Sequence, residues 1–286
     1  MTAADLLVDI TAAGRPALRV EAAGRSLLLI RQGDEPVVIA RVEDDHYGVE
    51  YVRTDRYRSP VPPLRADHAA RVAAGGEADW WTRWAHHFRS ELRDGPLHAG
   101  RWLISSRIPR LQSGLWRWEV LGADRGYLEW VGDWPVLPLR ALSGVDHGRV
   151  KAYRRQARDG ILPPVLLWWV SGLVGYVVVD GHDRLAAALA EDRKPPLLAL
   201  TLVDRAETAA SERALVDRYL ANEARMRRHP GTAAALTVLG QCFGKDLWAA
   251  ARREGRTRAW PLPGGTPAWT RLAARHAPDL AGLADR

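Results

Sequence analysis

The chain contains very little cysteine, methionine and phenylalanine. Its 286 residues include one Cys, Cys242, together with two Met and two Phe. A single cysteine excludes an internal disulfide framework and leaves too few thiols for a structural zinc site. The sequence also lacks an apolar run of eighteen residues, so we expect no transmembrane helix and no membrane partner.

The usual signatures of secretion and of several enzyme classes are missing as well. The first twenty residues contain no basic stretch followed by an apolar core, which a secretory signal requires. We therefore predict a cytoplasmic protein. A Walker-type phosphate loop is absent, and neither Ser105-Ser106 nor Ser143-Gly144 has the flanking residues of a nucleophile elbow.

Positive charge is in excess over negative charge. The chain has 41 Lys and Arg against 34 Asp and Glu, a formal net charge of +7, and its pI is about 10.0. Such a balance favours phosphate-rich partners. However, nearly all of this charge is arginine, scattered along the chain and matched locally by acidic residues, and GC-rich coding alone produces an alanine- and arginine-rich chain. Both phosphate binding and a solvated basic surface stay open.

The first 130 residues have the pattern of a β-rich module. Short alternating or β-branched runs within residues 6–58 predict a meander, and the prolines of residues 59–66 end it. A helix is predicted over 67–92, with Trp80, Trp81, Trp84 and Phe88 on one face. Three further strands are expected, at 100–108, 114–122 and 126–132.

Tryptophan is abundant, with 13 residues in the chain. Trp116 and Trp118 stand at alternating positions, where their rings could stack bases or sugars. Core packing in a module short of phenylalanine explains the same pattern.

A different order of elements begins near Trp134. The pattern predicts strand, helix, strand, strand, helix, strand up to Asp204, followed by helices from about residue 208. Within residues 232–255 the order is helix, Gly-containing turn and helix, the order of a DNA-binding helix-turn-helix. However, the second helix has few polar residues with which to contact base edges.

Residues 177–189, VVVDGHDRLAAAL, place ionisable residues between a strand and a helix. The first N–H groups of a helix lack partners within the helix and carry partial positive charge, so this end suits an anion. Gly181 permits a tight turn, and Arg184 can grip a phosphate oxygen. Asp180 and Asp183 suit a metal-phosphate complex, and His182 can donate to phosphate or move a proton. Helix capping and an internal Arg184 ion pair are the structural alternatives.

Residues 134–204 resemble the ParB/sulfiredoxin superfamily domain. The resemblance rests on the Pro-Leu-Arg-x-Leu entry, a helix ending at Gly160, a Pro-Pro-x-x-x-x-Trp strand, a hairpin and the Asp-Gly-x-x-Arg turn. It covers about a quarter of the chain. Members share a nucleotide site at this turn. Sulfiredoxins have an indispensable cysteine in the turn, which is absent here, so sulfinate repair is not expected.

Two other branches of the superfamily match in part. Asp180, Gly181, His182 and Arg184 match the Asp-Gly-His-His-Arg form of free serine kinases and other ParB-like proteins, but the kinase's glutamate base has no counterpart in the entry region. ParB proteins bind CTP with a divalent ion and carry a Glu-Asn-x-x-Arg motif on a later helix. Asn222 and Arg225 match this motif, with alanine in place of the glutamate.

The sequence thus predicts an α+β protein with three parts. A β-rich module (1–130) is followed by a ParB/sulfiredoxin-like domain (131–206) and a helical C-terminal region (207–286). The resemblance implies a Mg²⁺-dependent protein that binds ATP or CTP and hydrolyses it or transfers its phosphoryl group. The alternative is a non-catalytic module, switched by nucleotide, whose N- or C-terminal region meets DNA or a protein.

The expected roles divide among seven residues. The expected catalytic residues are Asp180, His182 and Asp183, and Asp180 is also the expected metal ligand. The expected nucleotide-binding residues are Gly181, Arg184, Asn222 and Arg225.

Overall fold

The computed structural model describes most of the chain in ten stretches. They are residues 5–11, 14–43, 47–76, 79–92, 95–108, 120–130, 135–203, 205–228, 233–250 and 255–281. Trp116, Trp118 and most of the strand predicted at 114–122 lie outside them. The fold is a mixed α+β class, as predicted. The chain divides into two compact units, unit 1 (residues 1–201 and 257–286) and unit 2 (residues 202–256).

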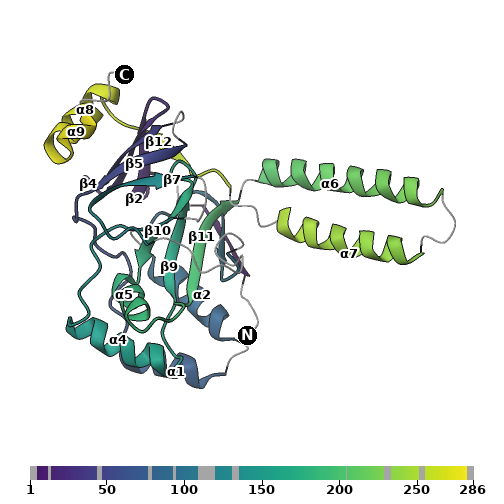
Figure 1. The fold of residues 1–286 in the computed structure, drawn as a ribbon, viewed down its shortest axis with the longest axis horizontal. Helices are drawn as coiled ribbons and strands as arrows, with labels where there is room; N and C mark the ends of the chain where they lie inside the picture. The colour runs from purple at the N-terminus through teal and green to yellow at the C-terminus, as the bar shows by residue number, and fades with distance from the viewer. Residues whose placement is uncertain are drawn as a thin grey trace. The chain divides into compact units, whose positions relative to one another are not determined.

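The first sheet contains the strands that carry the Asp-Gly turn (Figure 1). Its strand order is β1-β6-β11-β9-β10-β8. The bounds are β1 Asp5–Ile10, β6 Gly100–Ser105, β8 Val136–Pro138, β9 Val165–Val170, β10 Gly175–Asp180 and β11 Leu197–Val203. Every residue of β9 and β10 is buried, as expected for strands covered on both faces.

Two helices complete the strand and helix order predicted after Trp134. Helix α4 spans Gly148–Arg158 and α5 spans His182–Ala190. They pack together through Val150, Ala186 and Ala187. Strands β1 and β6 join the same sheet, so residues on both sides of the predicted boundary at 130/131 share one layer.

The second sheet contains the predicted meander. Its strand order is β12-β2-β3-β4-β5-β7, and β2 to β5 pair antiparallel in sequence order. The bounds are β2 Leu18–Ala23, β3 Leu27–Gln32, β4 Glu35–Glu43, β5 Gly48–Arg53, β7 Arg125–Glu129 and β12 Ala259–Pro261.

The end of the chain returns to this N-terminal sheet. Strand β12 pairs parallel with β2, and helices α8 (Gly265–His276) and α9 (Pro278–Ala281) follow it. Trp269 of α8 is fully buried, packs in one apolar cluster with Leu29 and Ile39, and donates from its indole N–H to the backbone oxygen of Leu28 at 3.0 Å. Burial of this ring ties α8 to the sheet.

The single helix predicted over 67–92 is wrong. The structure has two helices, α1 (Ala66–Ala74) and α2 (Trp80–Glu91). Gly76 has a φ of +88°, a left-handed conformation that glycine adopts readily and that ends a helix. Three of the four residues predicted for the apolar face, Trp80, Trp84 and Phe88, are buried in α2, whereas Trp81 is partly exposed.

Unit 2 contains two long helices, α6 (Arg205–Met226) and α7 (Ala233–Ala250), which lie side by side (Figure 1). The rings of Tyr219 and Phe243 are 4.5 Å apart between centroids. The glycine turn predicted inside residues 232–255 is wrong, because α7 continues through Gly240 and Gly244. Glycine lowers helix stability by about 1 kcal/mol without breaking the helix. Across the described ranges, no helix is long and apolar enough to cross a membrane.

Candidate functional site

The Asp-Gly turn forms a buried polar corner at the end of β10. Strand β8 runs parallel to β10, so the loop after β8 and the turn after β10 meet at the carboxyl edge, where open α/β sheets bind ligands. Gly181 is the N-cap of α5, with a φ of +94°. The side chains of Asp180, His182, Asp183 and Arg184 are brought together here, and these residues are between 1% and 7% exposed.

Asp180 and Arg184 form an internal ion pair. The guanidinium of Arg184 lies 2.6 Å from Asp180 Oδ2 and donates to the backbone oxygen of Pro164 at 2.9 Å. The hydroxyl of Ser59 donates to the other oxygen of Asp180 at 2.5 Å. Because Arg184 is committed to partners inside the protein, it positions the turn and does not face a ligand in this structure.

Asp183 is held by the loop that follows β8. Its Oδ1 accepts from the hydroxyl of Ser143 at 2.7 Å and from the guanidinium of Arg140 at 3.0 Å. Burial raises the pKa of Asp183, but the bonds from Ser143 and Arg140 outweigh it and bring this pKa below its ordinary value. Asp183 is therefore a carboxylate at neutral pH. The side chain of Arg140 is 30% exposed, unlike that of Arg184.

His182 precedes Asp183 in the chain and is 1% exposed. Burial, assisted by the charge of Arg140, lowers the pKa of His182 well below its ordinary value, so the ring is neutral at pH 7. Its Nε2 is buried and has no hydrogen-bond partner among the residues that the structure describes. The ring of Tyr57 lies 5.6 Å away between centroids, and the Tyr57 hydroxyl donates to the backbone oxygen of Val179 at 2.6 Å.

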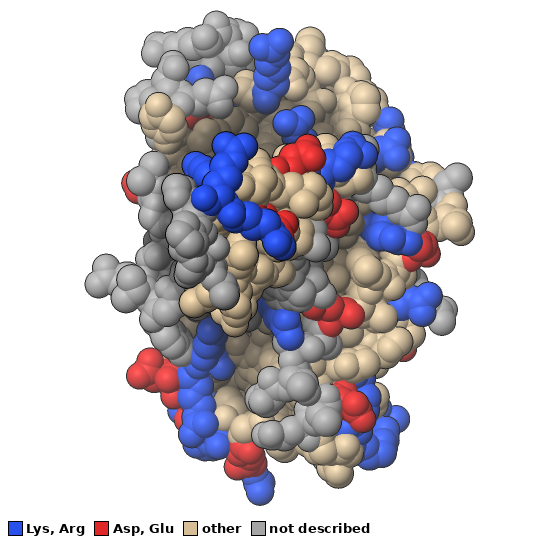
Figure 2. All heavy atoms as spheres, turned by 90° about the vertical axis from the view of Figure 1, so that its right-hand side faces the viewer, with Lys and Arg blue, Asp and Glu red and all other residues tan. Residues whose placement is uncertain are grey.

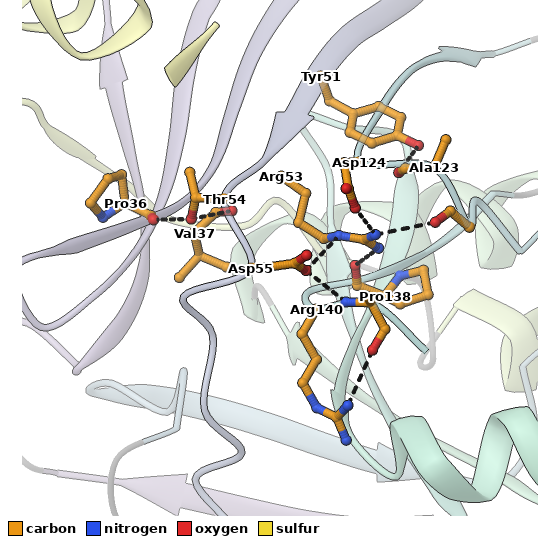
Figure 3. Close-up of polar contacts among 12 residues, drawn as sticks. Pro36, Val37, Tyr51, Arg53, Thr54, Asp55, Ala123, Asp124, Pro138 and Arg140 are labelled. Carbon is orange, nitrogen blue, oxygen red and sulfur yellow. Dashed lines mark hydrogen bonds and ion pairs between the residues drawn. The ribbon is translucent and has the colours of Figure 1, made fainter. Parts of the chain in front are cut away.

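A second network fixes the backbone around Arg140 (Figure 3). Arg53, at the end of β5, has a fully buried side chain that ion-pairs with Asp55 and Asp124. The same guanidinium donates to the backbone oxygen of Pro138 at 3.1 Å. Asp55 in turn accepts from the backbone N–H of Ala141 at 2.7 Å. Arg140 thus stands between two anchored backbone positions, which limits the conformations that its segment can adopt.

The arrangement favours binding an anion over abstracting a proton. Gly181 has no side chain with which to cap the N-terminus of α5, and the helix dipole makes this end attractive to negative charge. Arg140 is the partly exposed cation beside this end. Asp183 accepts from the guanidinium of Arg140, and its lowered pKa makes it a weak base.

The predicted role of Asp180 as a magnesium ligand stays a prediction. Both of its oxygens are engaged, one by Ser59 and one by Arg184. Within the described residues, no group of three or more His, Cys, Asp or Glu side chains could hold a metal ion.

Asn222 and Arg225 lie in α6 of unit 2. There Arg225 donates to the side-chain oxygen of Asn222 at 2.8 Å, and the contact is exposed. Their predicted role in binding a nucleotide stays a prediction.

Sequence reasoning gave no site role to Arg140, Ser143, Tyr57 or Ser59. A signal for Arg140 was present, because it is the arginine of the Pro-Leu-Arg-x-Leu entry. Ser143 was considered only as a nucleophile. Tyr57 and Ser59 come from a segment more than a hundred residues before the turn, and local patterns do not report such distant contacts.

The basic surface expected from composition is discontinuous where it can be seen. On the face in Figure 2, Lys and Arg side chains form several separate groups with Asp and Glu side chains among them. A stripe of positive charge, typical of proteins that track a nucleic-acid backbone, is not present on this face among the described residues.

No family model, curated protein or solved structure matches the chain. The resemblance to the ParB/sulfiredoxin superfamily therefore rests on the sequence motifs. The case for a function rests on the geometry of the corner at α5.

Proposed function

We propose that the chain is a nucleotide-binding module of the ParB/sulfiredoxin type, in which nucleotide binding changes the conformation of the loop after β8. The phosphate groups would lie at the N-terminus of α5. The observation that carries the proposal is Arg140, a partly exposed guanidinium held against Asp183 in the first turn of α5, whose N-cap is a glycine.

Arg140 replaces Arg184 as the phosphate-binding arginine in this proposal. Moving Arg184 onto a ligand would leave Asp180 charged and buried without its partner, which costs about 3–5 kcal/mol. Arg140 faces a smaller barrier, because its side chain is 30% exposed whereas that of Arg184 is 4% exposed, and an ion pair that reaches solvent is worth less than a buried one. A phosphate oxygen offers Arg140 a charge-assisted bond of the same kind.

His182 supports the same placement. Its Nε2 is buried without a partner among the described residues, and an unsatisfied buried polar atom costs about 1–3 kcal/mol. A neutral imidazole can donate to a phosphate oxygen from this nitrogen without carrying charge into the interior. Asp180 and Asp183 are both paired with arginine, so we favour binding without phosphoryl transfer. Magnesium would then enter with the nucleotide's phosphates rather than through Asp180.

The test compares two arginines in matched settings. Arg140 is 30% exposed and pairs with Asp183 in the first turn of α5, whereas Arg154 is 32% exposed and pairs with Glu191 at the C-terminal end of α5. Binding of ATP, CTP and GTP, each with and without magnesium, is measured by calorimetry and thermal shift. At least one nucleotide should stabilise the native chain in a concentration-dependent way.

Arg140→Ala should weaken that binding at least about tenfold, since a hydrogen bond to a charged group contributes about 1.5–3 kcal/mol. Arg154→Ala should leave it unchanged. Release of phosphate is followed in the same samples, and turnover that requires Asp180 or Asp183 would contradict a non-catalytic role. Absence of binding by every nucleotide, or equal affinities of the two variants, would refute the proposal.

A further inference from the structure

Unit 1 has a concave surface that shares no residue with the corner at α5. A cavity of about 600 Å³ lies between β2, β3 and α8, within the range of about 300–1,000 Å³ that small-molecule sites occupy. Five of its lining residues are arginines, and we call it the arginine cavity. They are Arg15, Arg19, Arg31, Arg271 and Arg275.

A buried carboxylate forms the base of the arginine cavity. Glu21 is 1% exposed and lies 2.7 Å from Arg19, 3.2 Å from Arg31 and 4.0 Å from Arg15. One carboxylate thus orients three guanidinium groups from three places in the chain. It cannot neutralise them, and Nε of Arg31 and Oε2 of Glu21 remain buried without a well-directed hydrogen bond.

Helix α8 contributes two more cations. Arg271 and Arg275 are one helical turn apart and therefore lie on the same face of α8. Both are exposed, and in the described part of the chain neither forms an ion pair. The lining includes only two acidic residues, Glu21 and Asp34. Five guanidinium groups against two carboxylates leave a surplus of three positive charges.

The rest of the lining is apolar. Leu262, Pro263, Ala268 and Leu272 form this part, and Leu262 is also part of the core under α8. Guanidinium groups beside an apolar wall interact with an anion more strongly than they would in open water, because the local dielectric is lower. A concave site with charged and apolar parts suits a small organic anion better than an extended phosphodiester backbone, which needs no apolar wall.

We propose that the arginine cavity binds a small organic molecule that carries two or more phosphate groups. Each phosphate monoester brings about 1.5–2 negative charges and three acceptor oxygens, so two such groups compensate the surplus of positive charge. The planar guanidinium fork matches phosphate oxygens in pairs. Arg271 and Arg275 contact the ligand from α8, while Arg19 and Arg31 contact it from the sheet in the orientation that Glu21 imposes.

The test uses the full chain and two probes, inorganic pyrophosphate and a sugar bisphosphate. Calorimetry at physiological salt should show binding of at least one probe. Arg271→Ala/Arg275→Ala should weaken it at least tenfold. This variant should fold normally, because the buried face of α8 is formed by Trp269 and Ala273, which are unchanged. Its thermal midpoint without probe reports the fold.

The charge-matched control is Arg65→Ala/Arg89→Ala, which removes two exposed arginines from outside the cavity and should bind the probe as the native chain does. Lack of binding by both probes, or equal weakening in the two double variants, would overturn the proposal. Tight binding of duplex DNA that neither probe competes with would also overturn it. Arg140→Ala should leave probe binding at this cavity intact, so failure here is distinguishable from failure of the proposed nucleotide site.

Discussion

Two glycines with similar backbone conformations allow the packing of Arg184 to be measured. Gly181 and Gly160 have φ values of +94° and +73°, so alanine at either position incurs left-handed strain of about 1–2 kcal/mol. Their surroundings differ. A Cβ at residue 160 would meet nothing within 4 Å, whereas at residue 181 it would lie 2.7 Å from a terminal nitrogen of Arg184 and 3.0 Å from its Cζ.

The guanidinium of a flexible arginine often moves aside at little cost in free energy, but the guanidinium of Arg184 is held in place. Arg184 is 3% exposed and bonded to both Asp180 and Pro164. Displacing it removes the partner of a buried carboxylate, a loss of about 3–5 kcal/mol when complete. Allowing for partial relaxation, we expect Gly181→Ala to destabilise the protein by roughly 2 kcal/mol more than Gly160→Ala.

The measurement is thermal unfolding followed by circular dichroism on the native chain and both variants. For a unit of this size, an extra 2 kcal/mol corresponds to a midpoint lower by about 4–8 °C. Unit 2 can unfold separately, so the transition is also followed by the fluorescence of tryptophans in unit 1, such as Trp84 and Trp269. Equal midpoints for the two variants would show that Arg184 moves freely and would refute the internal role given to it.

Two further predictions concern the same corner. His182 stays neutral in the folded protein because its pKa is lowered. In the unfolded chain the same imidazole takes up a proton below about pH 6.5. The contribution of His182 to the free energy of unfolding is therefore complete above that pH and is lost as the pH falls. Between pH 7 and pH 5.5 the native chain should lose about 1 kcal/mol more than His182→Gln in urea titrations, and parallel pH profiles would count against this. Arg184→Met should cost about 3–5 kcal/mol with or without nucleotide, and adding Asp180→Asn should recover part of it. If Arg184→Met instead abolished nucleotide binding at unchanged stability, Arg184 would be a ligand residue.

Local sequence patterns determined the elements around the site. Alternation of apolar residues predicted the meander of β2 to β5, and the valine run before Asp180 predicted the strand that leads into α5. The Asp-Gly turn was predicted from the permissive backbone of Gly181. These features depend on residues within one or two turns of each other, so a short window of sequence contains the information. The break at Gly75-Gly76 was missed and a turn was wrongly predicted at Gly240 and Gly244, because glycine occurs both just after helix ends and inside helices.

Only the tertiary structure decided which charges pair and which face solvent. The sequence left open whether Arg184 grips a ligand or pairs with an aspartate, and packing closed the corner around the Asp180 ion pair. The return of α8 to the N-terminal sheet places Arg271 and Arg275 at one cavity with Arg19 and Arg31, some 240 residues earlier in the chain. Such contacts depend on the burial of apolar faces from distant segments, such as that of Trp269 against β3. Secondary-structure propensity and residue spacing are local properties, so they do not determine which distant apolar faces pack together.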